Sequence, residues 1–98
     1  MTIEEATGKV SKLASNNGGK VNATINFKFD EGIIHLNDTV SPTLVTNEEK
    51  SAQCTIAMSI ENFGKMMSGD MNPMMAFMTG KMKIEGDKGV AMKLASLF

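Results

Sequence analysis

The chain has a single cysteine and a single histidine, two side chains that can together form a nucleophile for acyl transfer. Cys54 lies within an alternating segment that predicts a strand, and we expect its side chain to face the interior. His35 belongs to another predicted strand, which presents it to solvent. A Cys–His pair would therefore need a coincidence of register. We interpret Cys54 as a buried structural thiol and His35 as a surface histidine, and we predict that the chain is not an enzyme.

Metal binding would have to use methionine. Met71-x-x-Met74 and Met75-x-x-Met78 have spacings that suit thioether coordination of the soft ion Cu(I). These methionines are interleaved with Phe77 at helical spacing, however, and no Cys or His accompanies them. The pattern therefore favours an apolar lining over a metal site. We predict no metal and no cofactor, and Cu(I) binding stays the weakest alternative.

Adjacent acidic residues offer little for general acid–base chemistry. They lie at expected helix starts and loop tips, where charge is normally solvated: Glu4-Glu5, Asp30-Glu31 and Glu48-Glu49. Four lysines in the C-terminal part can form a mild basic rim that meets a lipid headgroup, although lysines on exposed faces are more often only solvated: Lys81, Lys83, Lys88 and Lys93.

Methionine is concentrated in one part of the chain. Eight of the ten methionines lie between Met58 and Met82. Methionine is unbranched and polarizable, so it lines surfaces that accept more than one shape, whereas a core built for stability uses better-defined side chains. We interpret the cluster as the wall of a hydrophobic ligand cavity, the alternative being an ordinary methionine-rich core. The predicted ligand-binding residues are Ile56, Met58, Phe63, Met66, Met67, Met74, Phe77, Met78, Met82, Ile84, Leu94 and Phe98.

Composition limits the classes of function. The 98 residues suffice for one domain, which we place at residues 1–98. Positive charge comes from ten lysines and no arginine, and both Trp and Tyr are absent, so neither a basic face nor a stacking platform for nucleic acid is expected. No apolar run has the length of a signal peptide or a membrane span. We expect a soluble, cytoplasmic protein.

Periodicity predicts an α+β fold. The apolar residues between Thr2 and Ser15 recur at helical spacing, and strict alternation from Val21 to Phe29 is typical of a strand buried on one face. Strands with one solvated face and helices gathered on the other predict a two-layer arrangement. The remaining elements are expected as strands near 33–37, 43–47, 54–60 and 81–85, and as helices that start at the caps Ser59, Asn72 and Asp87 and stop, for the first two, at Gly69 and Gly80.

The C-terminal half resembles the sterol carrier protein 2 family of lipid-transfer domains. The resemblance is carried by Asn72-Pro73, by the run from Ala76 to Ile84, by Gly86-Asp87 and by the run from Ala91 to Leu94. The segment from Cys54 to Phe63 is similar to the strand and helix start that precede this block. Residues 1–50 match only in arrangement.

The resemblance implies a five-stranded, largely antiparallel sheet with helices on one face that enclose a hydrophobic tunnel. It also implies binding and transfer of fatty acids, fatty acyl-coenzyme A, phospholipids or sterol-like molecules without chemical conversion, with transient membrane contact. Many members have an aspartate where this chain has Gln53, and this chain ends in Ser96-Leu97-Phe98 rather than a peroxisomal signal. The alternative is an interaction module whose methionine surface forms a homodimer or docks onto another protein.

Overall fold

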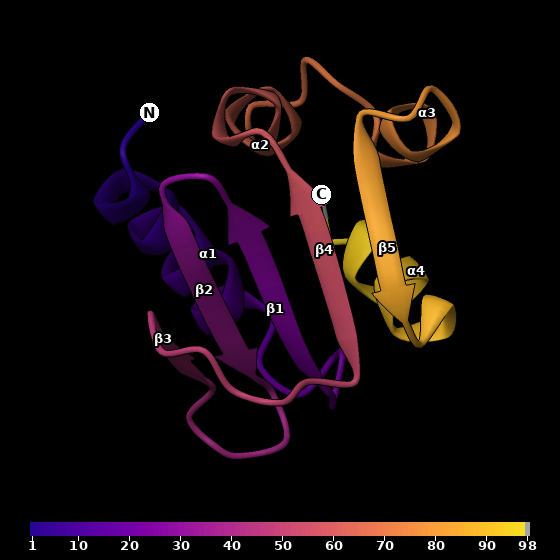
Figure 1. Cartoon of the computed structure of the whole chain (residues 1–98). Coiled ribbons are helices and arrows are strands. Elements are labelled where there is room, and N and C mark those ends of the chain that lie inside the picture. Colours follow the sequence, from indigo (N-terminus) through magenta and orange to yellow (C-terminus); the bar gives the residue numbers. More distant parts are fainter. Residues whose placement is uncertain (98) are drawn as a thin grey trace.

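A computed structural model describes residues 1–97 and contains, within them, one five-stranded sheet and four helices (Figure 1). The predicted α+β class is confirmed. The elements in chain order are α1 (Ile3–Asn16), β1 (Thr24–Phe29), β2 (Gly32–Asn37), β3 (Leu44–Thr46), β4 (Cys54–Met58), α2 (Ile60–Met67), α3 (Pro73–Met78), β5 (Met82–Gly86) and α4 (Lys88–Ala95).

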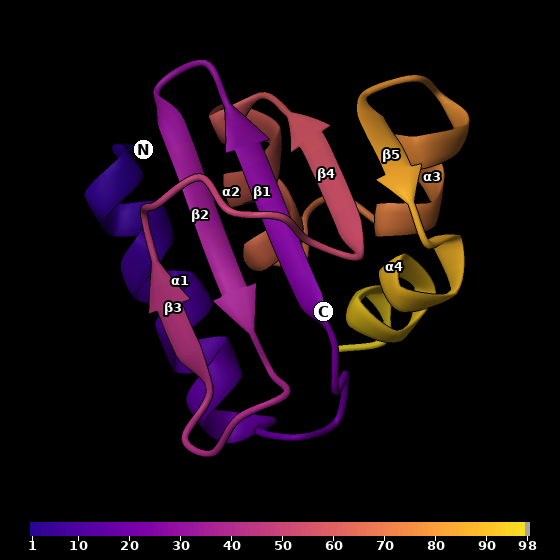
Figure 2. The same cartoon turned by 60° about the horizontal axis from the view of Figure 1, so that its bottom comes forward.

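The sheet has the strand order β3-β2-β1-β4-β5, so β1 is central and β5 is an edge strand. Three pairs are antiparallel, as predicted, but β1 and β4 run parallel. A parallel pair needs a crossover connection. Here the segment after β3 crosses the sheet face opposite the helices before it enters β4 (Figure 2). The side chain of Asn26 on β1 anchors it, because Nδ2 donates a 2.7 Å hydrogen bond to the carbonyl oxygen of Lys50.

The crossover explains why the prediction for His35 was wrong. His35 is only 5% exposed, since it lies beside Asn26 on the sheet face that the crossover covers. The Asn26 amide nitrogen already donates to Lys50, so its Oδ1 is free to accept, and His35 Nδ1 lies 2.6 Å from it. This geometry assigns the imidazole proton to Nδ1. Burial, with a smaller effect of the Lys50 charge, lowers the pKa of His35 below its ordinary value.

The opposite face of the sheet packs against the helices and forms the core. Alternation places Ile25, Phe27 and Phe29 of β1 on this face, and each is 6% exposed or less. The ring of Phe63 on α2 lies 5.5 Å from that of Phe27 and 5.1 Å from that of Phe29, measured between centroids. Such tilted aromatic contacts add to the stabilisation from burial. The core is therefore centred under β1 and α2.

The predicted helix caps are confirmed. Thr2 and Glu5 form a reciprocal capping box at the start of α1, and Ser59, Asn72 and Asp87 cap α2, α3 and α4. Each cap oxygen accepts hydrogen bonds from backbone amides that have no partner inside the helix. Local sequence therefore sets where each helix begins.

Asp38 joins two loops at the start of the sheet. Its carboxylate accepts hydrogen bonds from the backbone amides of Gly19, Val21 and Asn22 and from the hydroxyl of Thr43, at 2.7–2.9 Å. Burial raises the pKa of Asp38, but these hydrogen bonds outweigh it and hold the pKa below its ordinary value. They also explain why β1 begins at Thr24 rather than at Val21, because the amides of Val21 and Asn22 are directed to Asp38.

Candidate functional site

An apolar cavity of about 130 Å³ lies between the β4–β5 side of the sheet and the helices α2, α3 and α4. Its walls come from the five consecutive elements that make up the C-terminal part of the chain, from β4 to α4. Among the described residues that line it, one is charged and the others are apolar. The lining residues are Ile56, Met66, Pro73, Met74, Phe77, Met82, Ile84, Lys88, Ala91, Met92, Leu94 and Ala95.

The floor of the cavity is set by strand register. Ile56 of β4 is directly opposite Ile84 of β5, and Met82 of β5 is opposite Met58 of β4. Side chains opposite each other on adjacent strands share a face, so these residues all point toward the helices. Met82 is 5% exposed and Ile84 is partly buried. The β4–β5 edge of the sheet therefore supplies the apolar floor of the cavity.

A glycine brings β5 close to the start of β4. Gly86 has a φ of +90°, and a Cβ at this position would overlap the carbonyl oxygen of Gln53. That oxygen accepts a 2.8 Å hydrogen bond from the amide of Asp87, the N-cap of α4. The Gln53 side chain also accepts a 3.1 Å hydrogen bond from the amide of Thr24. Gln53 thus ties β1, β4 and the start of α4 together, which positions α4 over the cavity.

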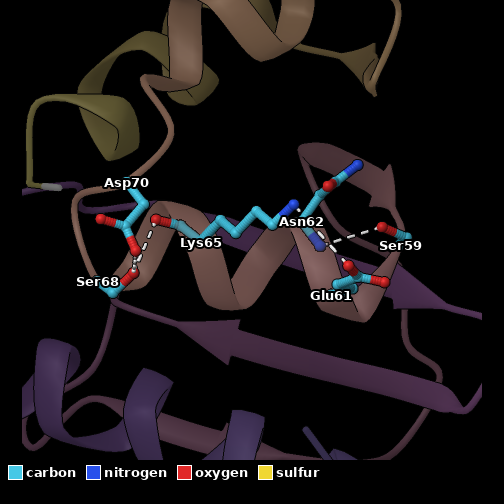
Figure 3. Close-up of polar contacts among 6 residues, drawn as sticks. All are labelled: Ser59, Glu61, Asn62, Lys65, Ser68 and Asp70. Carbon is cyan, nitrogen blue, oxygen red and sulfur yellow. Dashed lines mark hydrogen bonds and ion pairs between the residues drawn. The ribbon is translucent and has the colours of Figure 1, made fainter.

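Helix α2 presents its apolar side to the interior and its polar side to solvent. Met66 is 3% exposed and forms part of the cavity wall. Figure 3 shows the opposite side, where Lys65 lies 3.8 Å from Glu61 and the Ser68 hydroxyl donates a 3.0 Å hydrogen bond to Asp70. Lys65 and Glu61 are both exposed, so this side of α2 faces solvent. The burial of Phe63 and Met66 determines which side of α2 faces the interior.

Helix α3 covers one side of the cavity and is held weakly. Its only fully buried side chain is Ala76. Gly80, with a φ of +77°, lets the amide of Lys81 donate to the carbonyl of Ala76 and closes the helix in a Schellman turn. Met74 and Phe77 line the cavity and are nevertheless 49% and 39% exposed. The cavity is therefore open to the surface along α3.

Helix α4 forms the remaining wall. Lys88, Ala91, Met92 and Ala95 recur at helical spacing along the cavity, and Leu94 is 1% exposed beneath them. Lys88 brings its aliphatic stem to an apolar wall, an arrangement that leaves its ammonium group free to reach water. It is the one described cavity residue that can meet a polar group of a ligand.

The structure brings seven of the predicted binding residues together around the cavity: Ile56, Met66, Met74, Phe77, Met82, Ile84 and Leu94. Met58 and Phe63 are buried in the core behind it, Met67 faces a shallow groove beside α1, and Met78 is 74% exposed. Phe98 lies outside the described residues. Contact of any of these residues with a ligand stays a prediction.

Sequence reasoning did not place Pro73, Lys88, Ala91, Met92 or Ala95 in the cavity wall, although it named Lys88 as part of a basic rim. Four of them follow the helical repeat that starts at the Asp87 cap, so a helical wheel of α4 would have found them. Pro73 was recognised only as a helix start. Small residues such as Ala91 shape a cavity by the space they leave, which makes them hard to recognise from residue type.

The Cys–His pair considered from the sequence does not form. Cys54 is in register with Ile25 and points toward the helices, whereas His35 is in register with Asn26 and points to the other face. Burial, followed by the charge of Asp87, raises the pKa of the Cys54 thiol. A buried thiol with a raised pKa is a weak nucleophile at neutral pH. Cys54 is 0% exposed, so the prediction of a buried thiol is confirmed.

Within residues 1–97, no group of three or more His, Cys, Asp or Glu side chains is placed to hold a metal ion. None of the helices in this range is long and apolar enough to cross a membrane.

The model of the SCP-2 sterol transfer family matches residues 2–98. The chain belongs to this family. Human sterol carrier protein 2 is 47% identical over 55 residues, which cover 56% of this chain and 10% of that protein. Hydroxysteroid dehydrogenase-like protein 2 of Xenopus tropicalis is 46% identical over 55 residues, covering 54% and 13%. The chain thus matches about a tenth of the length of these curated relatives.

Solved structures of SCP-2 proteins share the fold. Sterol carrier protein domain 2 of Helicoverpa armigera has a TM-score of 0.75 and 29% identity, and the match covers 94% of this chain and 84% of that one. Sterol carrier protein 2 of Yarrowia lipolytica, in its apo form, has a TM-score of 0.73 and 24% identity, with 90% and 75% covered. The resemblance found in the sequence is confirmed, and with it the five-stranded sheet covered by helices.

Proposed function

We propose that this chain carries a lipid by enclosing part of its apolar chain in the cavity and releases it chemically unchanged. The observation that supports this most is the cavity itself, because a chain of the SCP-2 family here lines an internal space with apolar side chains and one lysine. Such a lining offers contact to methylene groups and no group placed for bond cleavage. Fatty acids, fatty acyl-coenzyme A, phospholipids and sterol-like molecules are the candidate ligands.

The free energy of burial is sufficient for such binding when most of the acyl chain is covered. Each buried methylene contributes about 0.8 kcal/mol, so a sixteen-carbon chain gains roughly 12 kcal/mol if all of it is buried. Association and ordering cost on the order of 4–15 kcal/mol. Micromolar affinity is the result to expect, with weak selectivity between chains that differ by one methylene.

The size of the cavity limits how much of a ligand it can enclose. A dry cavity of about 150 Å³ holds a ligand the size of benzene, whereas sites for whole drug-sized ligands measure about 300–1,000 Å³. The cavity of about 130 Å³ therefore fits only the leading part of an acyl chain. The rest must follow the exposed surface of α3 and α4, or α3 must move outward. Because Ala76 is the one fully buried side chain of α3, such a movement uncovers little of α3 itself.

Native mass spectrometry of the purified protein tests the proposal, followed by organic extraction of what is released. We expect a lipid that leaves on denaturation and whose mass shows no chemical change after incubation. Phe77→Asp, in the cavity wall, should reduce uptake of palmitate at least tenfold. Val40→Asp is the matched control, because Val40 is 42% exposed, close to the 39% of Phe77, and lies outside the cavity.

Two outcomes would contradict the proposal. An apo mass that persists after incubation with long-chain lipids would mean that the cavity is only a packing defect of a filled core. A doubled mass without lipid would instead favour the interaction module. Equal loss of uptake in both variants would remove Phe77 from the proposed binding wall.

A further inference from the structure

The methionines of this chain differ widely in their exposure to solvent. Three are buried, at 9% exposure or less: Met58, Met66 and Met82. Five are exposed: Met1 (43%), Met74 (49%), Met75 (57%), Met78 (74%) and Met92 (62%). Four of the exposed ones belong to α3 and α4, which both lie beside β5 in the two views (Figures 1 and 2). A small reactant dissolved in water therefore meets several methionines at this end of the molecule.

Two of the exposed methionines are also part of the cavity wall. Met74 of α3 and Met92 of α4 line the cavity, whereas Met75 and Met78 lie outside it. Two further methionines line the cavity, Met66 and Met82, but they are only 3% and 5% exposed. Met74 and Met92 are therefore the cavity methionines that a reactant in solution can reach without any movement of the helices.

The thioether sulfur of methionine reacts with hydroperoxides by oxygen transfer. The sulfur attacks one peroxide oxygen, so that an S–O bond forms and the O–O bond breaks. The proton of the transferred oxygen passes to the leaving oxygen, which departs as water or an alcohol. The sulfur is oxidised by two electrons and the peroxide is reduced by two. The product, methionine sulfoxide, is polar, and sulfoxide reductases return it to methionine.

The single cysteine does not compete for the oxidant. Peroxides react with cysteine as the exposed thiolate. Cys54 is 0% exposed, and its raised pKa keeps the thiol protonated at neutral pH. The sulfur atoms that a peroxide reaches first are therefore those of the exposed methionines.

The position of a methionine determines what its oxidation does to the cavity. Apart from Lys88, the described lining residues are apolar. A sulfoxide on Met74 or Met92 places a polar oxygen at this wall, and covering a polar group with methylenes is unfavourable when it has no hydrogen-bond partner. A sulfoxide on Met75 or Met78 lies outside the cavity and leaves its wall apolar. The same modification should therefore affect ligand binding at two positions and not at the other two.

We propose that Met74 and Met92 are sites of reversible oxidation by hydroperoxides, and that their sulfoxides prevent the cavity from taking up an acyl chain. This regulation rests on the lipid carriage proposed above. In the thioether form the two side chains give the wall an apolar, adaptable surface. In the sulfoxide form they make the same wall polar, and reduction restores binding.

Peptide mapping by mass spectrometry after treatment with hydrogen peroxide tests the sites. We expect sulfoxides at Met74, Met75, Met78 and Met92 well before any at Met66, because oxidation follows exposure. Palmitate bound before the treatment should slow oxidation of Met74 and Met92 by about threefold or more, since it covers the cavity wall. It should leave the oxidation rates of Met75 and Met78 unchanged.

Palmitate uptake before and after peroxide, followed by native mass spectrometry, tests the consequence. Uptake by the wild type should fall about tenfold. Reduction by methionine sulfoxide reductases specific for the two sulfoxide epimers should restore it. In Met74→Leu combined with Met92→Leu, uptake after peroxide should nearly equal uptake before it, because the reactive sulfurs of the wall are gone. Met75→Leu combined with Met78→Leu is the matched control, and it should lose uptake as the wild type does.

Three results would overturn this regulation. The first is unchanged uptake when Met74 and Met92 are fully oxidised. The second is a loss of uptake that persists in the Met74 and Met92 variant but not in the Met75 and Met78 variant. The third is a loss that accompanies unfolding, seen by circular dichroism of the oxidised wild type. Absence of palmitate uptake in untreated protein would instead contradict lipid carriage itself, so the two failures are distinguished.

Discussion

Helices α2 and α3 carry similar side chains at the same spacing and bury them to different extents. Each has three large apolar residues at positions i, i+3 and i+4: Phe63, Met66 and Met67 in α2, and Met74, Phe77 and Met78 in α3. In α2 the first two are 0% and 3% exposed, whereas in α3 the corresponding residues are 49% and 39% exposed. The difference arises from where each helix lies relative to the sheet.

The position of each helix over the sheet determines how far its apolar side chains are buried. Helix α2 lies over the central strand, where Phe63 contacts Phe27 and Phe29. Helix α3 packs beside β5, the edge strand, and within residues 1–97 no further strand covers its apolar residues. The same pattern therefore builds the core in one helix and an open, adaptable wall in the other.

The largest effect should come from the aromatic residue of α2. Phe63→Ala should lower the free energy of unfolding by about 3–5 kcal/mol, because it removes a fully buried ring and leaves a cavity. Phe77→Ala should cost much less, since that ring is 39% exposed and one side already faces open space. Urea denaturation of both variants measures the difference. Similar costs would mean that α3 is packed as firmly as α2.

Two glycines extend the same contrast to the backbone. Gly86→Ala should destabilise by about 3 kcal/mol or more, since it combines left-handed backbone strain with overlap between the new methyl group and the Gln53 carbonyl. Gly80→Ala, at the end of α3, carries similar strain at a φ of +77° but has no atom within 4 Å of the new methyl group. It should cost only about 1 kcal/mol. Thermal unfolding ranks the two, and a larger effect at Gly80 would reverse the comparison.

Asp38, which joins two loops at the start of the sheet, provides a pH-dependent test of stability. Asp38→Asn should lower the free energy of unfolding by about 1–3 kcal/mol at pH 7, because an amide cannot accept all four hydrogen bonds of the carboxylate. The folded-state pKa is lowered, so the contribution of Asp38 is present above its ordinary pKa of 3.8 and is lost as pH falls through the folded-state value.

Denaturation of wild type and Asp38→Asn across this pH range measures the effect. The stability difference between them should be constant near neutrality and should shrink in acid below the ordinary pKa. A stability difference that does not change with pH would show that the charge of Asp38 does not contribute to the stability of the fold. The hydrogen bonds to Gly19, Asn22 and Thr43 would then carry no charge-dependent stabilisation.

Local sequence predicted the elements and their ends well. The caps Ser59, Asn72 and Asp87 and the stops Gly69 and Gly80 are where they were expected, because capping depends on residues within a few positions of one another. The residues that carry the family resemblance also lie in the C-terminal half of the chain. The α+β class followed from strand alternation, which has a period that differs clearly from that of a helix.

Long-range features were harder to predict. The burial of His35 depends on a crossover that lies over the open sheet face, and the late start of β1 depends on amides that turn toward Asp38. Neither contact leaves a local periodicity. The exposure of Met78 likewise depends on the edge position of β5, which no pattern within α3 reveals. Residue type indicated a methionine-rich surface, and tertiary position decided which methionines face the cavity.

The smallest effect on stability should come from Met78. It is 74% exposed, so Met78→Ser should change the free energy of unfolding by less than about 0.5 kcal/mol. Met66→Ser, at 3% exposure in α2, should cost several times more and serves as the matched comparison. If Met78→Ser costs more than about 1 kcal/mol by urea denaturation, α3 must close onto the core in solution. If it costs nothing, the side chain of Met78 does not contribute to the stability of the fold.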